Sequence, residues 1–183
     1  MRRPAILLAL AICASAAPTS HASAQAGEVG FRDEFLREWD ERREKYVSLA
    51  EAMPAELYDW RPAEGVRSVA EVFMHMAAAN YNLARRLDVE PPAGFAVQGY
   101  ETSSSAKADV VAALRDSFAH LRRGAEALEP ADETRTMPWF GGSEITMRGF
   151  LLFLTGHAGE HLGQSIAYAR TNGVVPPWSS GSP

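Results

Sequence analysis

Two histidines four residues apart carry most of the chemistry that this sequence could perform. They are His157 and His161, in the run HAGEHLGQ at residues 157–164. On an α-helix, such residues lie about 40° apart around the axis and about 6 Å apart along it, so both imidazoles project from one face. The apolar, helix-periodic surroundings direct this face inward, where two neutral imidazoles favour a shared metal ion. The alternative is a pair of core histidines that merely pack.

A third metal ligand is expected from the other histidines of the chain. His75 lies on or beside the apolar stripe of a predicted helix, which makes it the preferred third ligand. His120 is the rival, but it lies near a charged helix face, and we expect it at the surface or at a boundary. Three imidazoles suit zinc, nickel, copper or ferrous iron and leave a coordination position open for water or a small-molecule substrate.

Two polar residues beside the histidine pair are candidates for a supporting or catalytic role. Gln164 lies one turn beyond His161 and could orient a histidine or bind a ligand. Glu160 could act as a partner of a histidine or as a base, or it could be a solvated carboxylate. Because imidazoles must be neutral to bind a metal, we predict that metal affinity falls below about pH 6.

The N-terminal residues have the pattern of a secretory signal peptide. Two arginines precede an apolar run over residues 5–17, and A-x-A cleavage patterns follow it. The run is short for a membrane span, so we expect residues 1–26 to be removed and a single domain, 27–183, to reach the periplasm or the extracellular space. A retained membrane anchor is the alternative.

The composition of the predicted mature chain excludes several classes of protein. The only cysteine, Cys13, lies in the signal segment. Residues 27–183 therefore contain no disulfide, no thiolate nucleophile and no thiolate ligand for a metal. This part of the chain has 16 basic and 23 acidic residues, a net charge of −7, which argues against nucleic-acid binding. Its 157 residues suffice for one core without a stabilising cross-link.

Hydrophobic periodicity predicts four helices in the mature chain. The predicted ranges are 31–53, 68–87, 107–128 and 147–172. Pro54 ends the first, and Ser68 and Glu71 form a capping box at the start of the second. Trp39 and Trp178 are expected to leave apolar surface exposed, which makes a homodimer possible.

The connections between these helices define the expected fold. Residues 91–105 form a long connection that allows a crossover and is a candidate rim or lid, and residues 136–146 suggest a small hairpin that turns on Gly141 and Gly142. The sequence therefore predicts an all-α protein, a four-helix bundle with a crossover connection and a small hairpin before the last helix.

The sequence resembles the DinB-like superfamily, also known as DinB/YfiT-like. The resemblance rests on residues 68–76 and 157–164 with the hairpin before the latter, and it spans about residues 31–172. It implies a four-helix bundle with a divalent metal site formed by His75, His157 and His161. Some relatives are transferases or isomerases that use bacillithiol, mycothiol or glutathione. The signal peptide departs from that pattern, because such thiols are chiefly cytosolic.

Three classes of function are therefore considered. The first is a metal-dependent transferase or hydrolase acting on a small molecule, and the second is a non-catalytic metal- or ligand-binding envelope protein. The third is a structural bundle whose histidines only pack. Residues 157–161 also match the H-x-x-E-H peptidase pattern, but only 22 residues follow His161 and none can supply the further ligand of that pattern.

Overall fold

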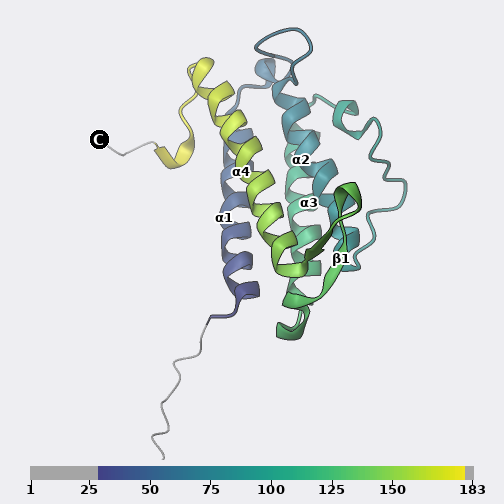
Figure 1. Ribbon diagram of the computed structural model, residues 1–183. Coiled ribbons are helices and arrows are strands. Elements are labelled where there is room, and N and C mark those ends of the chain that lie inside the picture. Colours follow the sequence, from purple (N-terminus) through teal and green to yellow (C-terminus); the bar gives the residue numbers. More distant parts are fainter. Residues whose placement is uncertain (1–28, 180–183) are drawn as a thin grey trace, which may run out of the picture.

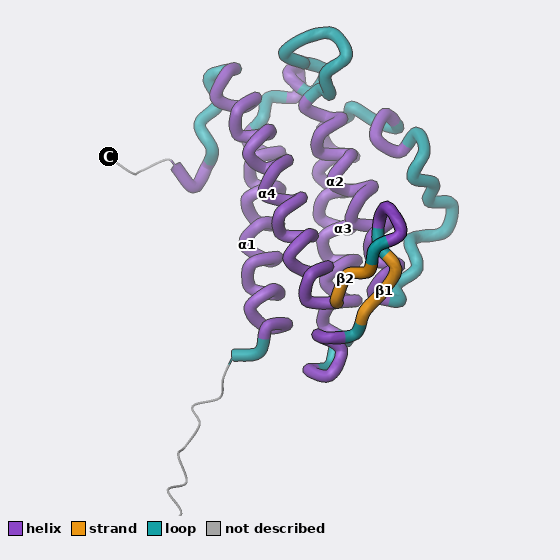
Figure 2. Tube along the Cα trace, viewed as in Figure 1, coloured by secondary structure: helices purple, strands orange, loops and turns teal. Residues whose placement is uncertain are grey.

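The protein is an all-α bundle, as predicted. The computed structural model describes residues 29–179, and the predicted signal peptide lies outside the described residues. The long helices are α1 (Phe31–Ala52), α2 (Val69–Ala84), α3 (Lys107–Glu126) and α4 (Met147–Thr171), and the strands of the hairpin are β1 (Thr136–Pro138) and β2 (Glu144–Thr146) (Figures 1 and 2). The predicted helices agree with these bounds to within three residues, and the largest difference arises because residues 85–87 form a 3-10 turn.

Helices adjacent in the sequence are not all adjacent in space. α1 packs against α3 and α4, and α2 also packs against α3 and α4, so α1 and α2 lie diagonally across the bundle. The long connection after α2 runs back along the outside of the bundle, so that α2 and α3 run parallel (Figure 1). This is the predicted crossover, and it includes a short 3-10 helix, η3 (Tyr100–Thr102).

Local signals in the sequence fix the starts of the two helices that carry the histidines. At the start of α2, the Ser68 hydroxyl accepts from the Glu71 backbone N–H at 3.2 Å, and the Glu71 carboxylate accepts from the Ser68 N–H at 2.7 Å. This is the predicted capping box. At the start of α4, the Thr146 hydroxyl accepts from the Gly149 N–H at 3.1 Å.

The hairpin before α4 forms as predicted. Its strands are antiparallel, and Met137 pairs with Ile145. Gly141 and Gly142 both have positive φ, at 68° and 78°, a conformation that glycine adopts without steric cost. The hairpin therefore turns where the two glycines were predicted, and it places aromatic side chains beside α4.

The core is rich in aromatic side chains, and one of them corrects an expectation from the sequence. Trp39 was expected to leave apolar surface exposed, but it is fully buried, and its indole N–H donates to the Phe118 carbonyl at 3.1 Å. Its ring stacks on Phe35 and packs against Phe118, because α3 covers this face of α1. Trp178 is 38% exposed, as expected. No helix within residues 29–179 is both long enough and apolar enough to span a bilayer.

Candidate metal centre

Three histidines from two helices meet at one edge of the bundle. α2 contributes His75, and α4 contributes His157 and His161. The ring centroid of His75 lies 5.5 Å from that of His157 and 4.6 Å from that of His161, and the two α4 rings are 4.8 Å apart. One ring nitrogen of each residue lies within 4.8 Å of the others. The structure thus brings together the three ligands proposed from the sequence, while their binding of a metal stays a prediction.

The cluster lies at the boundary of the core rather than inside it. Phe150 and Leu154, on the stripe that leads to the histidines, are buried, but all three imidazoles are only partly buried. The histidine stripe emerges from the core as α4 proceeds. The imidazoles are therefore shielded from bulk water on one side and accessible on the other, as a site for an exchangeable ligand requires.

A carboxylate from the long connection fixes the orientation of His75. Glu101, in η3, accepts a hydrogen bond from His75 Nδ1 at 3.0 Å, and its other oxygen pairs with Arg67 Nε at 2.6 Å. Because an ionised carboxylate only accepts hydrogen bonds, Nδ1 carries the proton and Nε2 keeps its lone pair. This arrangement of carboxylate, imidazole and free Nε2 is typical of histidines that bind metals in proteins.

A second chain of hydrogen bonds fixes His161. Its Nδ1 donates to the Gln164 side-chain oxygen at 3.0 Å, and the Gln164 amide donates to the Tyr168 hydroxyl at 2.9 Å. The Tyr168 hydroxyl donates in turn to the Arg67 carbonyl at 3.2 Å. Gln164 therefore orients a histidine, one of the two roles considered for it. Arg67 joins both chains of hydrogen bonds, through its side chain and through its backbone.

The third histidine is held by packing alone. None of the hydrogen bonds found among residues 29–179 involves the His157 imidazole, which lies parallel to the Phe153 ring with centroids 5.8 Å apart. Burial, followed by the positive charge that His161, His75 and Arg67 can carry, lowers the pKa of His157 to about 4. Burial is also the main cause of a lowered pKa at His75, although Glu101 opposes it. Both imidazoles are therefore neutral at pH 7.

These features fit a divalent metal. Neutral imidazoles are the form that binds metals, and the lowered pKa values of His75 and His157 keep them neutral without a metal. The hydrogen bonds of His75 and His161 leave Nε2 of these two rings free, and together with His157 they form a set of three imidazole donors that suits zinc, nickel or iron. His75 and His157 are thus already in the neutral form that a metal requires.

The lowered pKa of His157 predicts how the stability of the metal-free protein depends on pH. The unfolded chain protonates this histidine near pH 6.5, whereas the folded protein does so only near pH 4. Between these values the unfolded state binds more protons, so the free energy of unfolding falls as the pH is lowered through this window. Urea unfolding of the metal-free chain between pH 7 and pH 4 should show this fall.

A matched variant separates this effect from general acid destabilisation. In His157→Gln, the fall in the free energy of unfolding between pH 6.5 and pH 4 should be smaller than in the wild type, because glutamine does not titrate. Parallel pH curves for the two proteins would contradict the assignment. The same pKa implies that protons compete with a metal at His157 nearer pH 4 than the pH 6 expected from the reference value.

Two other residues proposed from the sequence lie away from the cluster. Glu160 is exposed on α4, and within the described part of the chain its carboxylate makes no hydrogen bond or ion pair, so its surroundings are those of a solvated carboxylate. His120, the rival third ligand, was expected at the surface or at a boundary. It is instead buried, since it is only 5% exposed. It packs against Tyr81, and its Nδ1 accepts from Arg123 at 2.9 Å, because α2 covers this face of α3.

Sequence reasoning missed Glu101 as a residue of the site. It lies 26 residues after His75, in a segment without hydrophobic periodicity, so no spacing rule connects the two. The only signal was indirect: residues 91–105 were a candidate rim of the site, and Glu101 is the one carboxylate among them. Burial acts to raise the pKa of Glu101, but the hydrogen bond and charge of Arg67, with a further contribution from His75, lower it overall. The carboxylate is therefore ionised when it contacts His75.

The contact with Glu101 predicts a loss of metal affinity on mutation. Glu101→Gln removes the negative charge that holds the His75 proton, and such partners typically contribute about 10- to 100-fold to affinity. We expect a weakening of this size for zinc, measured by competition with a chelating dye. Glu90→Gln is the matched control, because Glu90 lies just before the same connection but is highly exposed and pairs only loosely with Arg85. Equal affinity in wild type and Glu101→Gln would contradict this role.

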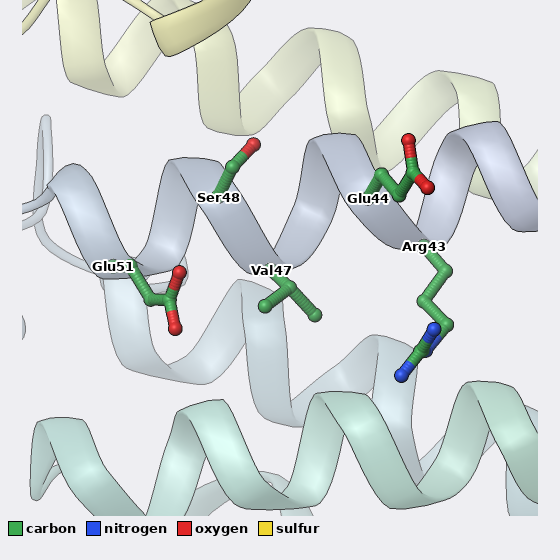
Figure 3. A pocket seen from close by; sticks show the side chains of 5 residues that line it. All are labelled: Arg43, Glu44, Val47, Ser48 and Glu51. Atoms are coloured by element: carbon green, nitrogen blue, oxygen red, sulfur yellow. The ribbon is translucent and has the colours of Figure 1, made fainter.

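Two of the three clustered histidines line a pocket of about 250 Å³. His75, His157 and Glu101 form its polar edge, and α2, α4, the long connection and the hairpin supply the remaining lining. The connection predicted as a rim or lid thus forms part of the wall. A different pocket, of about 270 Å³, is lined by residues of α1 alone, which are Arg43, Glu44, Val47, Ser48 and Glu51 (Figure 3). This α1 pocket contains no histidine, so the pocket of about 250 Å³ beside the histidines is the candidate site for chemistry.

Comparison with known proteins identifies the family. A family model described as the DinB superfamily matches residues 38–165, more than half of the chain, and this range includes all three clustered histidines. The chain belongs to the DinB superfamily. The match confirms the resemblance to this superfamily that residues 68–76 and 157–164 indicated. A comparison with curated proteins found no significant match.

Solved structures of DinB-like proteins share the fold. A DinB-like protein from Bacillus cereus ATCC 10987 is 17% identical with a TM-score of 0.68, and the match covers 78% of this chain and 93% of that one. A DinB-like protein from Bacillus subtilis is 19% identical with a TM-score of 0.62 and the same coverage. YfiT from Bacillus subtilis is 16% identical with a TM-score of 0.63, covering 79% and 89%; it is described as a probable metal-dependent hydrolase with an unusual four-helix bundle topology. At sequence identities of 16–19%, these similarities show that the DinB-superfamily chain shares the fold of the three structures, and they show the fold alone.

Proposed function

We propose that the protein is a metal-dependent enzyme of the hydrolase or transferase type that acts on a small molecule. The observation that carries the proposal is the convergence of His75, His157 and His161, of which His75 and His157 line a pocket, with His75 and His161 held so that Nε2 is free. Zinc, nickel and iron all suit this donor set. The description of YfiT as a probable metal-dependent hydrolase supports the hydrolase type.

The residues around the cluster would divide the work of such an enzyme. A divalent ion supplies Lewis-acid activation of water or of a substrate oxygen when bound. Glu101 and Gln164 hold His75 and His161 in orientation and keep the proton on Nδ1 of each ring. His75 and His157 border the pocket, so a small molecule bound there lies against two of the three proposed ligands. The aromatic and aliphatic residues that line the rest of this pocket limit the access of water to His75 and His157 from the pocket side.

The second candidate is a non-catalytic metal- or ligand-binding protein of the cell envelope. One observation favours it: Glu101 is the only carboxylate among the residues that line the pocket, and both of its oxygens are already engaged, by His75 and by Arg67. A base for proton transfer would have to come from the substrate, from solvent or from rearrangement of Glu101. Turnover of a small substrate would separate the two candidates.

Metal content tests the proposal directly. The purified chain comprising residues 27–183 should contain about one divalent metal ion per molecule by elemental analysis, after reconstitution with zinc, nickel or iron where necessary. The triple variant His75→Ala, His157→Ala, His161→Ala should contain none, while His120→Ala should keep the metal. Absence of metal from the wild type after reconstitution would refute the metal-dependent function. Metal-dependent hydrolysis of a panel of small esters would then favour the enzyme over the binder.

The N-terminal pattern supports a further part of the proposal. We propose that residues 1–26 direct export and that the mature chain works in the periplasm or outside the cell on a small-molecule substrate. This location argues against a cytosolic thiol as the second substrate. Fractionation of cells that express the full chain, with N-terminal sequencing of the exported form, tests export. A homodimer is possible in the same setting, and the partly exposed Trp178 is one candidate contact.

A further inference from the structure

The pocket beside the histidines has one polar edge and otherwise mostly apolar walls. The polar edge is formed by His75, His157 and Glu101. Six apolar residues supply most of the rest, namely Ala78, Ala79, Leu83, Val97, Phe140 and Phe153, and Asn82 is the one remaining polar residue. Among the lining residues there is no lysine or arginine. The pocket is therefore suited to a ligand with a polar group at the histidines and an apolar group away from them.

Two exposed apolar side chains meet at this pocket from distant parts of the chain. Val97 comes from the long connection and is 49% exposed, and Phe140 comes from the hairpin and is 64% exposed. They are two of only six exposed large apolar residues between residues 29 and 179. Isolated exposed apolar residues need no explanation, but convergent ones at a pocket indicate a binding surface.

The hairpin that carries Phe140 is fixed against the bundle. Trp139 packs edge-on against Phe153 with centroids 4.9 Å apart, and its ring is tilted against Phe140 with centroids 4.6 Å apart. The Arg86 guanidinium lies 5.0 Å from the centre of the Trp139 ring and donates to the Pro138 carbonyl at 2.7 Å. α4 and the 3-10 turn that follows α2 thus both hold the hairpin, so the apolar wall is in place before a ligand arrives.

The size and charge of the pocket define the ligand further. An engineered cavity of about 150 Å³ in another protein holds benzene, so a volume of about 250 Å³ holds one ring together with a small polar group. Glu101 is the only charged residue in the lining, and its charge is already paired with Arg67, so nothing along the apolar wall compensates a charge on the part of a ligand that lies there. We infer that the substrate is a small molecule with a polar group at the histidines and an uncharged apolar group about the size of one aromatic ring, the latter bound between Val97 and Phe140. This inference rests on the proposed metal site.

Two azoles that bind metals through the same nitrogen test the inference. The probes are imidazole and 4-phenylimidazole, titrated into the cobalt(II)-loaded protein and followed by visible absorption. We expect 4-phenylimidazole to bind about 10-fold more tightly, because the pocket removes its phenyl ring from water. Imidazole-4-acetate should bind less tightly than 4-phenylimidazole, because its charged carboxylate would lose water against the apolar wall without finding a partner there.

Matched variants assign this preference to the pocket. Phe140→Ala should lower the preference for 4-phenylimidazole by about 3-fold or more while leaving imidazole binding unchanged, since the residue contributes apolar area only. Leu152→Ala is the control, because Leu152 is similarly exposed but lies outside this pocket. Equal affinity for the two azoles, or a preference that Phe140→Ala leaves intact, would overturn the inference and leave the metal site standing. Failure of cobalt to bind would overturn both.

Discussion

Replacing His157 with alanine should lower the affinity of the protein for zinc by about 100-fold or more and leave the bundle folded. Zinc sites with four protein ligands bind with roughly 10–16 kcal/mol, so one ligand accounts for about 3 kcal/mol, which corresponds to more than 100-fold in affinity. The fold tolerates the change because His157 is only partly buried and forms none of the hydrogen bonds described for residues 29–179. Competition with a chelating dye near pH 7.5 measures the affinity.

The matched control for this experiment is His120→Ala. His120 is a histidine on another helix, more deeply buried than His157, and it lies outside the cluster. Its replacement should leave zinc affinity unchanged, although it removes the contacts with Tyr81 and Arg123. An unchanged affinity in His157→Ala would exclude this residue as a ligand. A loss of similar size in both variants would attribute the effect to the fold, and circular dichroism would show it.

The parts of the site that sequence could predict depend on local geometry. His157 and His161 share one helix, so their spacing alone places both imidazoles on one face. The capping box at Ser68 and Glu71 fixes the start of α2, and hydrophobic periodicity gives the face on which His75 lies. That His75 meets the other two depends on which helices are neighbours. The sequence left His120 open as a rival, and the packing of α2 against α4 brings His75 to the cluster.

The parts that sequence could not predict depend on contacts between distant segments. Glu101 reaches His75 only because the crossover returns along the outside of α2, and no periodic pattern marks that path. Val97 and Phe140 form the mouth of the pocket for the same reason, since each lies in an irregular segment. The misjudged burial of His120 has a related cause. The charges beside it on α3 indicated a boundary, but the side chain itself packs beneath Tyr81.

Trp39→Ala should be the most destabilising single replacement considered for this protein. Truncation of a fully buried tryptophan typically costs about 3–5 kcal/mol, as apolar burial is lost and a cavity remains. Here the change also leaves the Phe118 carbonyl without its hydrogen bond from the indole. Urea unfolding of the metal-free chain measures the loss. Trp39→Phe should cost less, because it keeps most of the ring, and Trp178→Ala should cost least, since Trp178 is partly exposed.

The Trp39→Ala variant also allows metal binding to be measured as a gain in the free energy of unfolding. A metal that binds only the folded state stabilises it by about 2.7 kcal/mol at 100 times its dissociation constant. Zinc at that excess should therefore restore much of the stability lost in Trp39→Ala, because Trp39 packs against α3 and not against the histidines. Adding His157→Ala to this variant should remove most of the rescue at the same zinc concentration, because a 100-fold weaker affinity leaves only about 0.4 kcal/mol. Equal rescue in the single and double variants would place the zinc elsewhere on the chain and contradict the three-histidine site.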